Sequence, residues 1–105
     1  MLRIYPVCMA MVREIQPYAE RIARFDRELA RQLCRSSTAV PLNVAEGTGT
    51  RGGRRRQAYE IALGEARETL ANLETAEAIG YIPRVGADVR TRLDHIIATL
   101  VDLVR

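Results

Sequence analysis

The chain has 105 residues and 48% of them are hydrophobic, which suits one domain over residues 1–105. No apolar run approaches the roughly 20 residues of a membrane span, and no signal-peptide cleavage pattern follows the N-terminus, so we expect a cytoplasmic protein without membrane association. All 16 basic residues are Arg, and residues 1–56 carry 11 of them against 5 acidic residues, whereas residues 57–105 are net acidic.

The first predicted helix spans residues 4–22. Its apolar side chains recur at steps of three and four, which places on one face Ile4, Cys8, Met11, Ile15, Tyr18 and Ile22. Pro17 cannot donate a hydrogen bond to the carbonyl of Arg13, so it predicts a kink or a helix that restarts. Cys8 and Cys34 fall inside helical patterns and are predicted to be buried free thiols.

A second helix is predicted behind the N-cap residue Asp26, with Phe25 packed beside it as a hydrophobic staple. Its predicted apolar face consists of Leu29, Leu33, Val40 and Val44. Pro41 lies inside this segment and predicts a bend rather than an end, because the apolar pattern resumes after it.

Residues 47–53 contain four glycines and predict a flexible loop. A third helix is predicted from about Arg54 to a terminating glycine at Gly80, with an apolar face of Tyr59, Ala62, Leu63, Ala66, Leu70, Leu73 and Ala76. Pro83 is expected to open the fourth helix, whose apolar residues are Val85, Val89, Leu93, Ile96, Ile97, Leu100, Val101, Leu103 and Val104. These cover more than one face, which predicts a second buried surface and hence self-association.

Short connections make neighbouring helices antiparallel. The sequence therefore predicts an all-α, antiparallel up-down-up-down four-helix bundle.

Three stretches carry a resemblance to a known family: residues 40–47 (VPLNVAEG), residues 61–68 (IALGEARE) and residues 80–82 (GYI). They resemble the bacterial four-helix bundle family first noticed as proteins encoded within intervening sequences of 23S ribosomal RNA genes. The resemblance implies a ring-shaped homo-oligomer, usually a pentamer. A relative in the family is the accessory protein of diversity-generating retroelements, a basic pentamer that binds a reverse transcriptase and nucleic acid. Glu65 and Thr69 depart from the family's usual residues, and no retroelement role is transferred.

The first of these stretches has a structural interpretation. Pro41 leaves the carbonyl of Ser37 without its helical partner, and Asn43 and Glu46 are placed to bond the backbone or neighbouring helices across that gap. Gly47 would then be the helix C-cap. A role for Asn43 and Glu46 in binding a ligand or partner stays open.

Four arginines within six residues form the strongest functional signal: Arg51, Arg54, Arg55 and Arg56. They lie at the predicted start of a helix, where unpaired N–H groups and the helix dipole attract anions. The sequence therefore predicts a nucleic-acid-binding site that contacts phosphates without sequence preference. A solvated loop whose charges aid solubility is the alternative.

A second basic stripe follows helical spacing on the second predicted helix: Arg24, Arg27, Arg31 and Arg35. It could extend the phosphate-binding surface. The alternative is pairing with acidic residues of the third helix, namely Glu60, Glu68, Glu74 and Glu77, or plain solvation.

Catalytic and cofactor signals are weak. Gly47, Gly49 and Gly52 match a dinucleotide fingerprint but follow a helix rather than a strand. The single His95 and two separated Cys do not make a zinc site. A carboxylate group facing into the bundle could come from Glu14, Glu65 and Glu68, without the histidines of di-iron bundles. We expect no metal, no cofactor and no enzyme.

The hypothesis from sequence is a non-enzymatic oligomeric adaptor that binds RNA or DNA electrostatically through the Arg51–Arg56 region. The alternative is a protein–protein scaffold that docks an acidic or enzymatic partner without nucleic acid.

Overall fold

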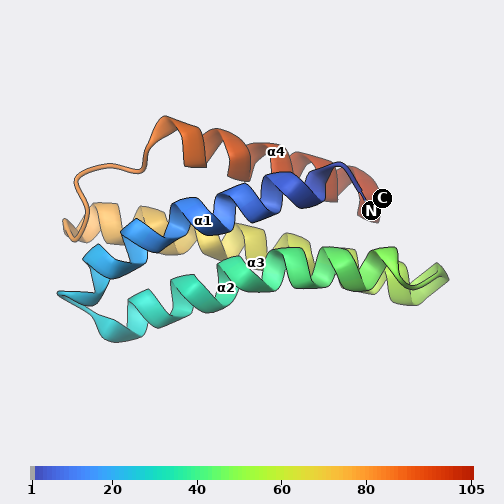
Figure 1. Cartoon of the computed structure of the whole chain (residues 1–105), viewed down its shortest axis with the longest axis horizontal. Coiled ribbons are helices and arrows are strands. Elements are labelled where there is room, and N and C mark those ends of the chain that lie inside the picture. Colours follow the sequence, from blue (N-terminus) through green and yellow to red (C-terminus); the bar gives the residue numbers. More distant parts are fainter. Residues whose placement is uncertain (1) are drawn as a thin grey trace.

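The computed structural model describes residues 2–105, which form four helices: α1 (Ile4–Ala23), α2 (Arg27–Thr48), α3 (Gly52–Ile79) and α4 (Ala87–Val104). Each helix packs against the next, and α4 packs back against α1, so the four enclose one core. The chain runs up and down along a bundle of 42 × 24 × 20 Å (Figure 1). The predicted all-α class and the four helices are confirmed, and no helix within residues 2–105 is long and apolar enough to cross a bilayer.

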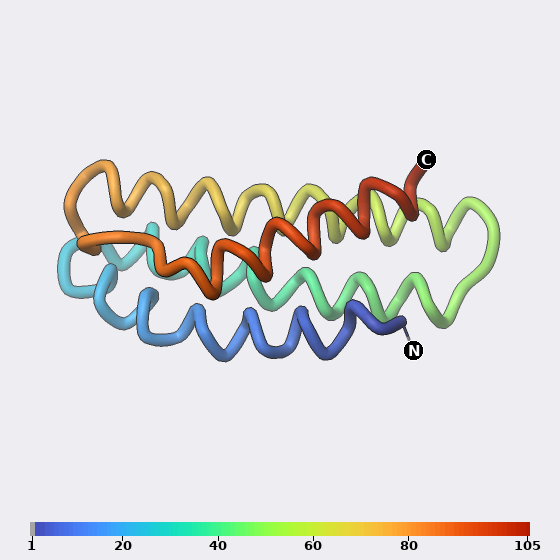
Figure 2. Tube along the Cα trace, turned by 90° about the horizontal axis from the view of Figure 1, so that it is seen from above, coloured from blue at the N-terminus to red at the C-terminus, as the bar shows by residue number. Residues whose placement is uncertain are grey.

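The two ends of the bundle differ. Both termini and the α2–α3 turn lie at one end, and the turn projects beyond the termini (Figure 2). The α1–α2 and α3–α4 connections lie at the other end. We call these the α2–α3 end and the opposite end.

The predicted apolar faces form the core. Its largest fully buried side chains are Met11, Ile15, Ile22, Leu33, Val40, Val44, Leu73, Ile82, Val89, Leu93, Ile96 and Leu100. Leu29 and Leu70, also predicted for these faces, are half-buried and pack against the core edge. Cys8 is buried as predicted, whereas Cys34 is half-buried, and both are free thiols.

The helix ends correct several predictions. α1 runs without interruption through Pro17, so it does not restart there, and α2 continues past Pro41 as expected. The predicted loop over residues 47–53 is only a three-residue turn, because α2 extends through Gly47 to Thr48 and α3 begins at Gly52. Two backbone N–H groups, from Gly49 and Thr50, bond back to carbonyls at the end of α2 and close it.

In the α3–α4 connection, the predicted end of α3 is confirmed and the predicted start of α4 is wrong. Gly80 ends α3 with a φ of 94°, the left-handed conformation that suits glycine. Pro83 does not open α4: it lies in the connection, and α4 begins at Ala87 behind the N-cap Gly86.

Most of the larger apolar residues of α4 beyond its fully buried stripe lie partly buried at the edge of the core. Ile97, Val101 and Val104 are partly buried against the protein's own core. Among the larger apolar side chains of α4, Leu103 is the exposed one, at 36%. The large apolar side chains that are more exposed lie elsewhere, on α2, on α3 and at the opposite end.

Candidate nucleic-acid interface

The α2–α3 turn presents the start of a long helix to solvent. Gly52, with a φ of 59°, and Gly53 have open space where a Cβ would lie. The N-cap residue Arg51 is extended, and its side chain caps no backbone N–H. The first N–H groups of α3 therefore lack the acceptor that Ser or Asp would provide at this position.

The four arginines of this region lie together but differ in their contacts. Arg55 donates through Nε to the carbonyls of Gly47, at 3.1 Å, and Thr50, at 2.8 Å, so it holds the turn closed. Arg56 pairs with Glu60 one helical turn away, at 2.9 Å. Arg51 and Arg54 are exposed, and neither takes part in an ion pair among residues 2–105. Arg51 and Arg54 are thus the side chains most available to an anion.

The Arg24–Arg35 stripe does not extend this surface. Arg35 crosses to α3 and pairs with Glu65, at 2.9 Å, and with Glu68, and these carboxylates raise its pKa above the ordinary value. The alternative of pairing with the third helix therefore holds for Arg35, although Glu65 was not among the expected partners.

The rest of the stripe lies nearer the opposite end. Arg31 pairs with Glu28 at 2.8 Å, and its hydrogen bonds lower the pKa of that carboxyl. Arg24 and Arg27 are exposed and lie where α1 connects to α2, at the far end from the α2–α3 turn (Figure 1).

The VPLNVAEG stretch divides into buried and exposed residues. Pro41 and Gly47 are buried, and a Cβ on Gly47 would lie 2.7 Å from Cδ1 of the buried Tyr59 ring. Gly47 is therefore a close-contact position and not the predicted C-cap, which is Gly49. Asn43 donates to the carbonyl of Ala39 at 2.8 Å, a backbone bond within α2 but not one to the Ser37 carbonyl that Pro41 leaves without its helical partner.

A groove that the sequence did not predict lies beside the Arg-rich turn, between α2 and α3. It is lined by Asn43, Glu46, Arg54, Gln57, Ala58 and Ile61. Ile61 is 46% exposed, and Leu42, the neighbour of Asn43, is 69% exposed. Helical periodicity assigned neither Leu42 nor Ile61 to a core face. Large apolar residues outside a core face were therefore the one signal in the sequence that indicated this exposed apolar surface.

The candidate catalytic groups do not converge. Glu65 and Glu68 are bound to Arg35, whereas Glu14 lies 2.6 Å from Arg92 of α4, an ion pair without hydrogen-bond alignment. Among residues 2–105 there is no cluster of metal-binding side chains and no strand to precede the glycine fingerprint.

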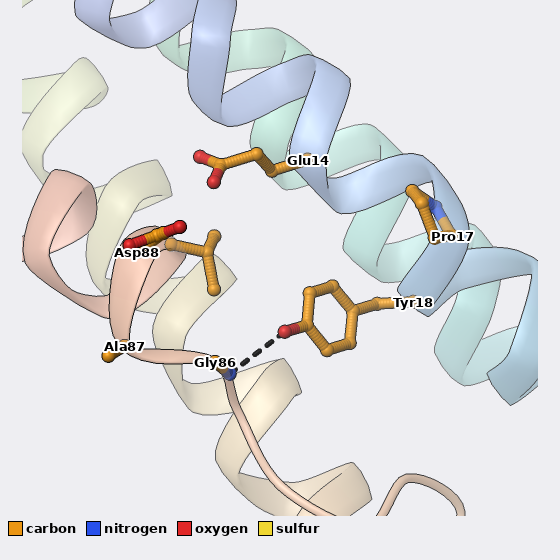
Figure 3. Close-up of a pocket in the computed structure, with 7 residues that line it drawn as sticks. Glu14, Pro17, Tyr18, Gly86, Ala87 and Asp88 are labelled. Atoms are coloured by element: carbon orange, nitrogen blue, oxygen red, sulfur yellow. Dashed lines mark hydrogen bonds between the residues drawn. The ribbon is translucent and has the colours of Figure 1, made fainter.

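A depression between α1 and the start of α4 contains the carboxylates of Glu14 and Asp88 (Figure 3). Within it, the hydroxyl of Tyr18 accepts a hydrogen bond from the Gly86 N–H at 2.8 Å, which fastens α1 to the start of α4. The contact explains how Gly86 is positioned as the α4 N-cap.

The fold has a counterpart among solved structures. A protein of unknown function of the S23 ribosomal protein family from Bacteroides thetaiotaomicron superposes with a TM-score of 0.81, at 19% identity, over 97% of this chain and 98% of that chain. At this identity the likeness shows the fold alone. No match is found among curated proteins.

The resemblance in the three sequence stretches has an independent test. The family model described as 23S rRNA-intervening sequence protein matches residues 1–102, nearly the whole chain. The chain belongs to the family of 23S rRNA-intervening sequence proteins.

Proposed function

We propose that the protein is a non-enzymatic oligomeric adaptor that binds RNA or DNA electrostatically at the α2–α3 end. The observation that supports this most directly is a pair of exposed arginines beside the uncapped start of α3, Arg51 and Arg54, which have no ion-pair partner within residues 2–105.

The charge arrangement is unfavourable without an anion. The N-terminus of a helix carries a partial positive charge, so cations there destabilise the helix and anions stabilise it. Arg51 and Arg54 add positive charge to this position. A bound phosphate would relieve the repulsion and accept hydrogen bonds from both guanidinium and backbone N–H groups.

The mechanism is neutralisation of phosphates with release of counterions. Such binding tolerates any base sequence and weakens steeply with salt. In a ring of copies, the pentamer being the expectation from the family resemblance, the basic turn would repeat and avidity would strengthen each weak contact. Sedimentation or native mass spectrometry measures the ring size directly, and a monomer at micromolar concentration would remove avidity from the mechanism.

The groove beside the turn favours a second candidate, a protein–protein scaffold. Ile61 offers exposed apolar area in the groove, which Glu46 and Arg54 also line, and the exposed Leu42 adjoins Asn43 of the groove. Apolar anchors rimmed by charges are typical of protein interfaces. In this case Arg54 would contact an acidic partner, and nucleic acid would not be required.

The test is a salt series of titrations with fluorescent single-stranded oligonucleotides. The variant Arg51→Gln/Arg54→Gln is compared with wild type, and Arg55 is kept because it holds the turn closed. We expect the slope of log affinity against log salt to fall by roughly 0.7 for each lost phosphate contact.

A matched control removes the same charge elsewhere. Arg13→Gln/Arg67→Gln changes two exposed arginines on the outer surfaces of α1 and α3. Equal slopes for both double variants would show general charge attraction rather than a site at the turn. No binding at low salt would eliminate the nucleic-acid role and leave the scaffold candidate.

A further inference from the structure

The opposite end of the bundle carries a stacked pair of aromatic rings, of which Phe25 is exposed and Tyr81 is half-buried. Phe25 lies in the α1–α2 connection and Tyr81 in the α3–α4 connection, and their ring centroids are 5.2 Å apart with an interplanar angle of 5°. Phe25 is 61% exposed, so it is not the buried staple that the sequence predicted. It is also the only Phe in the chain.

Hydrogen bonds fix the backbone at both residues. The N–H of Phe25 donates to the carbonyl of Ile22 at 2.9 Å, and the N–H of Tyr81 donates to that of Ala76 at 2.9 Å. Tyr81 directly follows the left-handed Gly80, which directs the chain out of α3. The pair is therefore a preformed platform with most of the Phe25 surface in solvent.

Three exposed arginines accompany the platform. Arg24 precedes Phe25 in the chain, and Arg21 and Arg84 line one depression together with Pro17, Tyr18 and Ile82. None of these arginines takes part in an ion pair among residues 2–105.

Two carboxylates near these connections have backbone partners. Asp26 accepts from the N–H of Leu29, at 2.9 Å, as the α2 N-cap, and Glu77 accepts from the N–H of Val85, at 2.7 Å. These two groups are thus engaged in holding the helix ends, while Arg21, Arg24 and Arg84 are exposed.

We propose that this end binds an unpaired nucleobase of a single-stranded nucleic acid, which stacks on Phe25 while Arg21, Arg24 and Arg84 contact the flanking phosphates. The inference rests on the proposed nucleic-acid role and adds the class of ligand. A flat exposed ring, with exposed arginines in and beside the same two connections, suits a base with its neighbouring phosphates. Stacking and charge attraction combine in single-strand recognition. A duplex does not fit, since its bases are already stacked and paired.

The two ends then have different requirements. The α2–α3 end contacts phosphates and is indifferent to bases, whereas the platform requires a base that is free to stack. Single strands are consequently preferred over duplexes, and any base serves because every base has a π-face.

The first experiment compares two oligonucleotides of equal length and charge, a single strand with bases and an abasic strand. We expect wild type to bind the strand with bases about tenfold more tightly, within the range that one base–aromatic stack supplies. Phe25→Leu keeps an apolar side chain without a ring and should abolish this difference. Phe25→Tyr keeps the ring and should retain it.

A second measurement uses the absence of tryptophan from the chain. Phe25→Trp introduces a single indole at the platform, and stacking of a base on it should quench its fluorescence. The strand with bases should quench and the abasic strand should not. Thermal unfolding of each variant checks that the exposed substitution leaves the fold intact.

The outcomes separate the two proposals. Equal affinity for both strands, unchanged by Phe25→Leu, would overturn the platform while leaving the phosphate site at the α2–α3 end. Absence of binding to either strand would overturn both. Quenching by the abasic strand as well would show that an occupant other than a base covers the indole, and would overturn the platform too.

Discussion

At the residue scale, the arginines of this small bundle differ in what they contact. Arg55 bonds two carbonyls and closes a turn, and Arg35 joins α2 to α3 through two carboxylates. Arg51 and Arg54 are exposed and take part in no ion pair within the described part of the chain. The arginines differ in their contacts because each guanidinium, with its five donors, bonds the carbonyl or carboxylate oxygens that lie within reach of it.

Gly47→Ala should destabilise the protein by about 1–3 kcal/mol, because the added methyl group would overlap the buried ring of Tyr59. Urea denaturation measures the loss. Gly49→Ala is the matched control, since its Cβ would meet only ordinary contacts at 3.7 Å and its φ is −85°. Comparable losses in both variants would contradict the close contact as the cause.

The buried Cys8 thiol should make the free energy of unfolding depend on pH. Burial raises its pKa from 9.0 to about 11. Between these values the unfolded thiol ionises while the folded thiol stays protonated, so the free energy of unfolding falls as pH rises, by about 3 kcal/mol at most. Below pH 9 the thiol contributes no pH dependence.

Denaturation of wild type and Cys8→Ala across pH 8–11 tests this, with the pH range set by the pKa of Cys8. Other titrating groups are common to both proteins, so the difference between the two curves isolates the thiol. Parallel curves would rule out an ionisation penalty at Cys8.

At the element scale, the helix starts differ in how they are capped. Asp26 caps α2 through its side chain, whereas Arg51 leaves the start of α3 without a side-chain acceptor. Because α3 is the longest helix, at 28 residues, packing along its length rather than its cap stabilises it. An uncapped start is therefore tolerated at the end proposed to bind anions.

Arg51→Ser should raise stability and weaken nucleic-acid binding together. The extended backbone at Arg51 suits a serine N-cap, which typically stabilises by about 1 kcal/mol, and the substitution also removes a cation from the positive end of the helix. Thermal unfolding and oligonucleotide titration measure the two effects. Arg51→Ala is the control, since it should weaken binding without gaining the cap.

A buried polar contact between α2 and α3 could not be predicted from the apolar periodicity of the sequence. Thr69 donates to Ser36 at 2.9 Å, and Asn72 lies 3.4 Å from the same hydroxyl. All three are buried. Sequence patterns exclude such residues from a core face, yet here they satisfy one another across the interface, because only the packed register brings them within reach.

At the scale of the whole molecule, the two proposed contact regions lie at opposite ends of a bundle 42 Å long. The termini lie beside the region at the α2–α3 end, and the α1–α2 and α3–α4 connections form the region at the opposite end (Figure 2). A strand long enough to reach both would gain effective concentration at the second region once the first is bound.

A length series of unpaired oligonucleotides should therefore show a step in affinity once a strand spans both ends. Linking two contacts makes the second one intramolecular, which raises affinity without any new contact type. Both Phe25→Leu and Arg54→Gln should remove the step. A smooth rise with length that neither variant changes would indicate independent, non-specific contacts instead.

The amino-acid sequence by itself determined the four helices, their core faces, the Asp26 cap and the Gly80 terminus, because helical periodicity and capping are local properties. Local patterns were less reliable at proline and glycine. Pro83 and Gly47 both have strong local preferences, but packing against other elements placed one in a connection and the other inside a helix against Tyr59.

Only the tertiary structure decided which charged and aromatic side chains remain available. It paired Arg35 with α3, separated Arg24 and Arg27 from the Arg-rich turn, and stacked Phe25 on Tyr81 from a connection more than 50 residues away in the chain. These outcomes depend on how antiparallel helices align at their ends. Spacing along one helix carries no information about that alignment, so the candidate surfaces emerge only when the bundle is assembled.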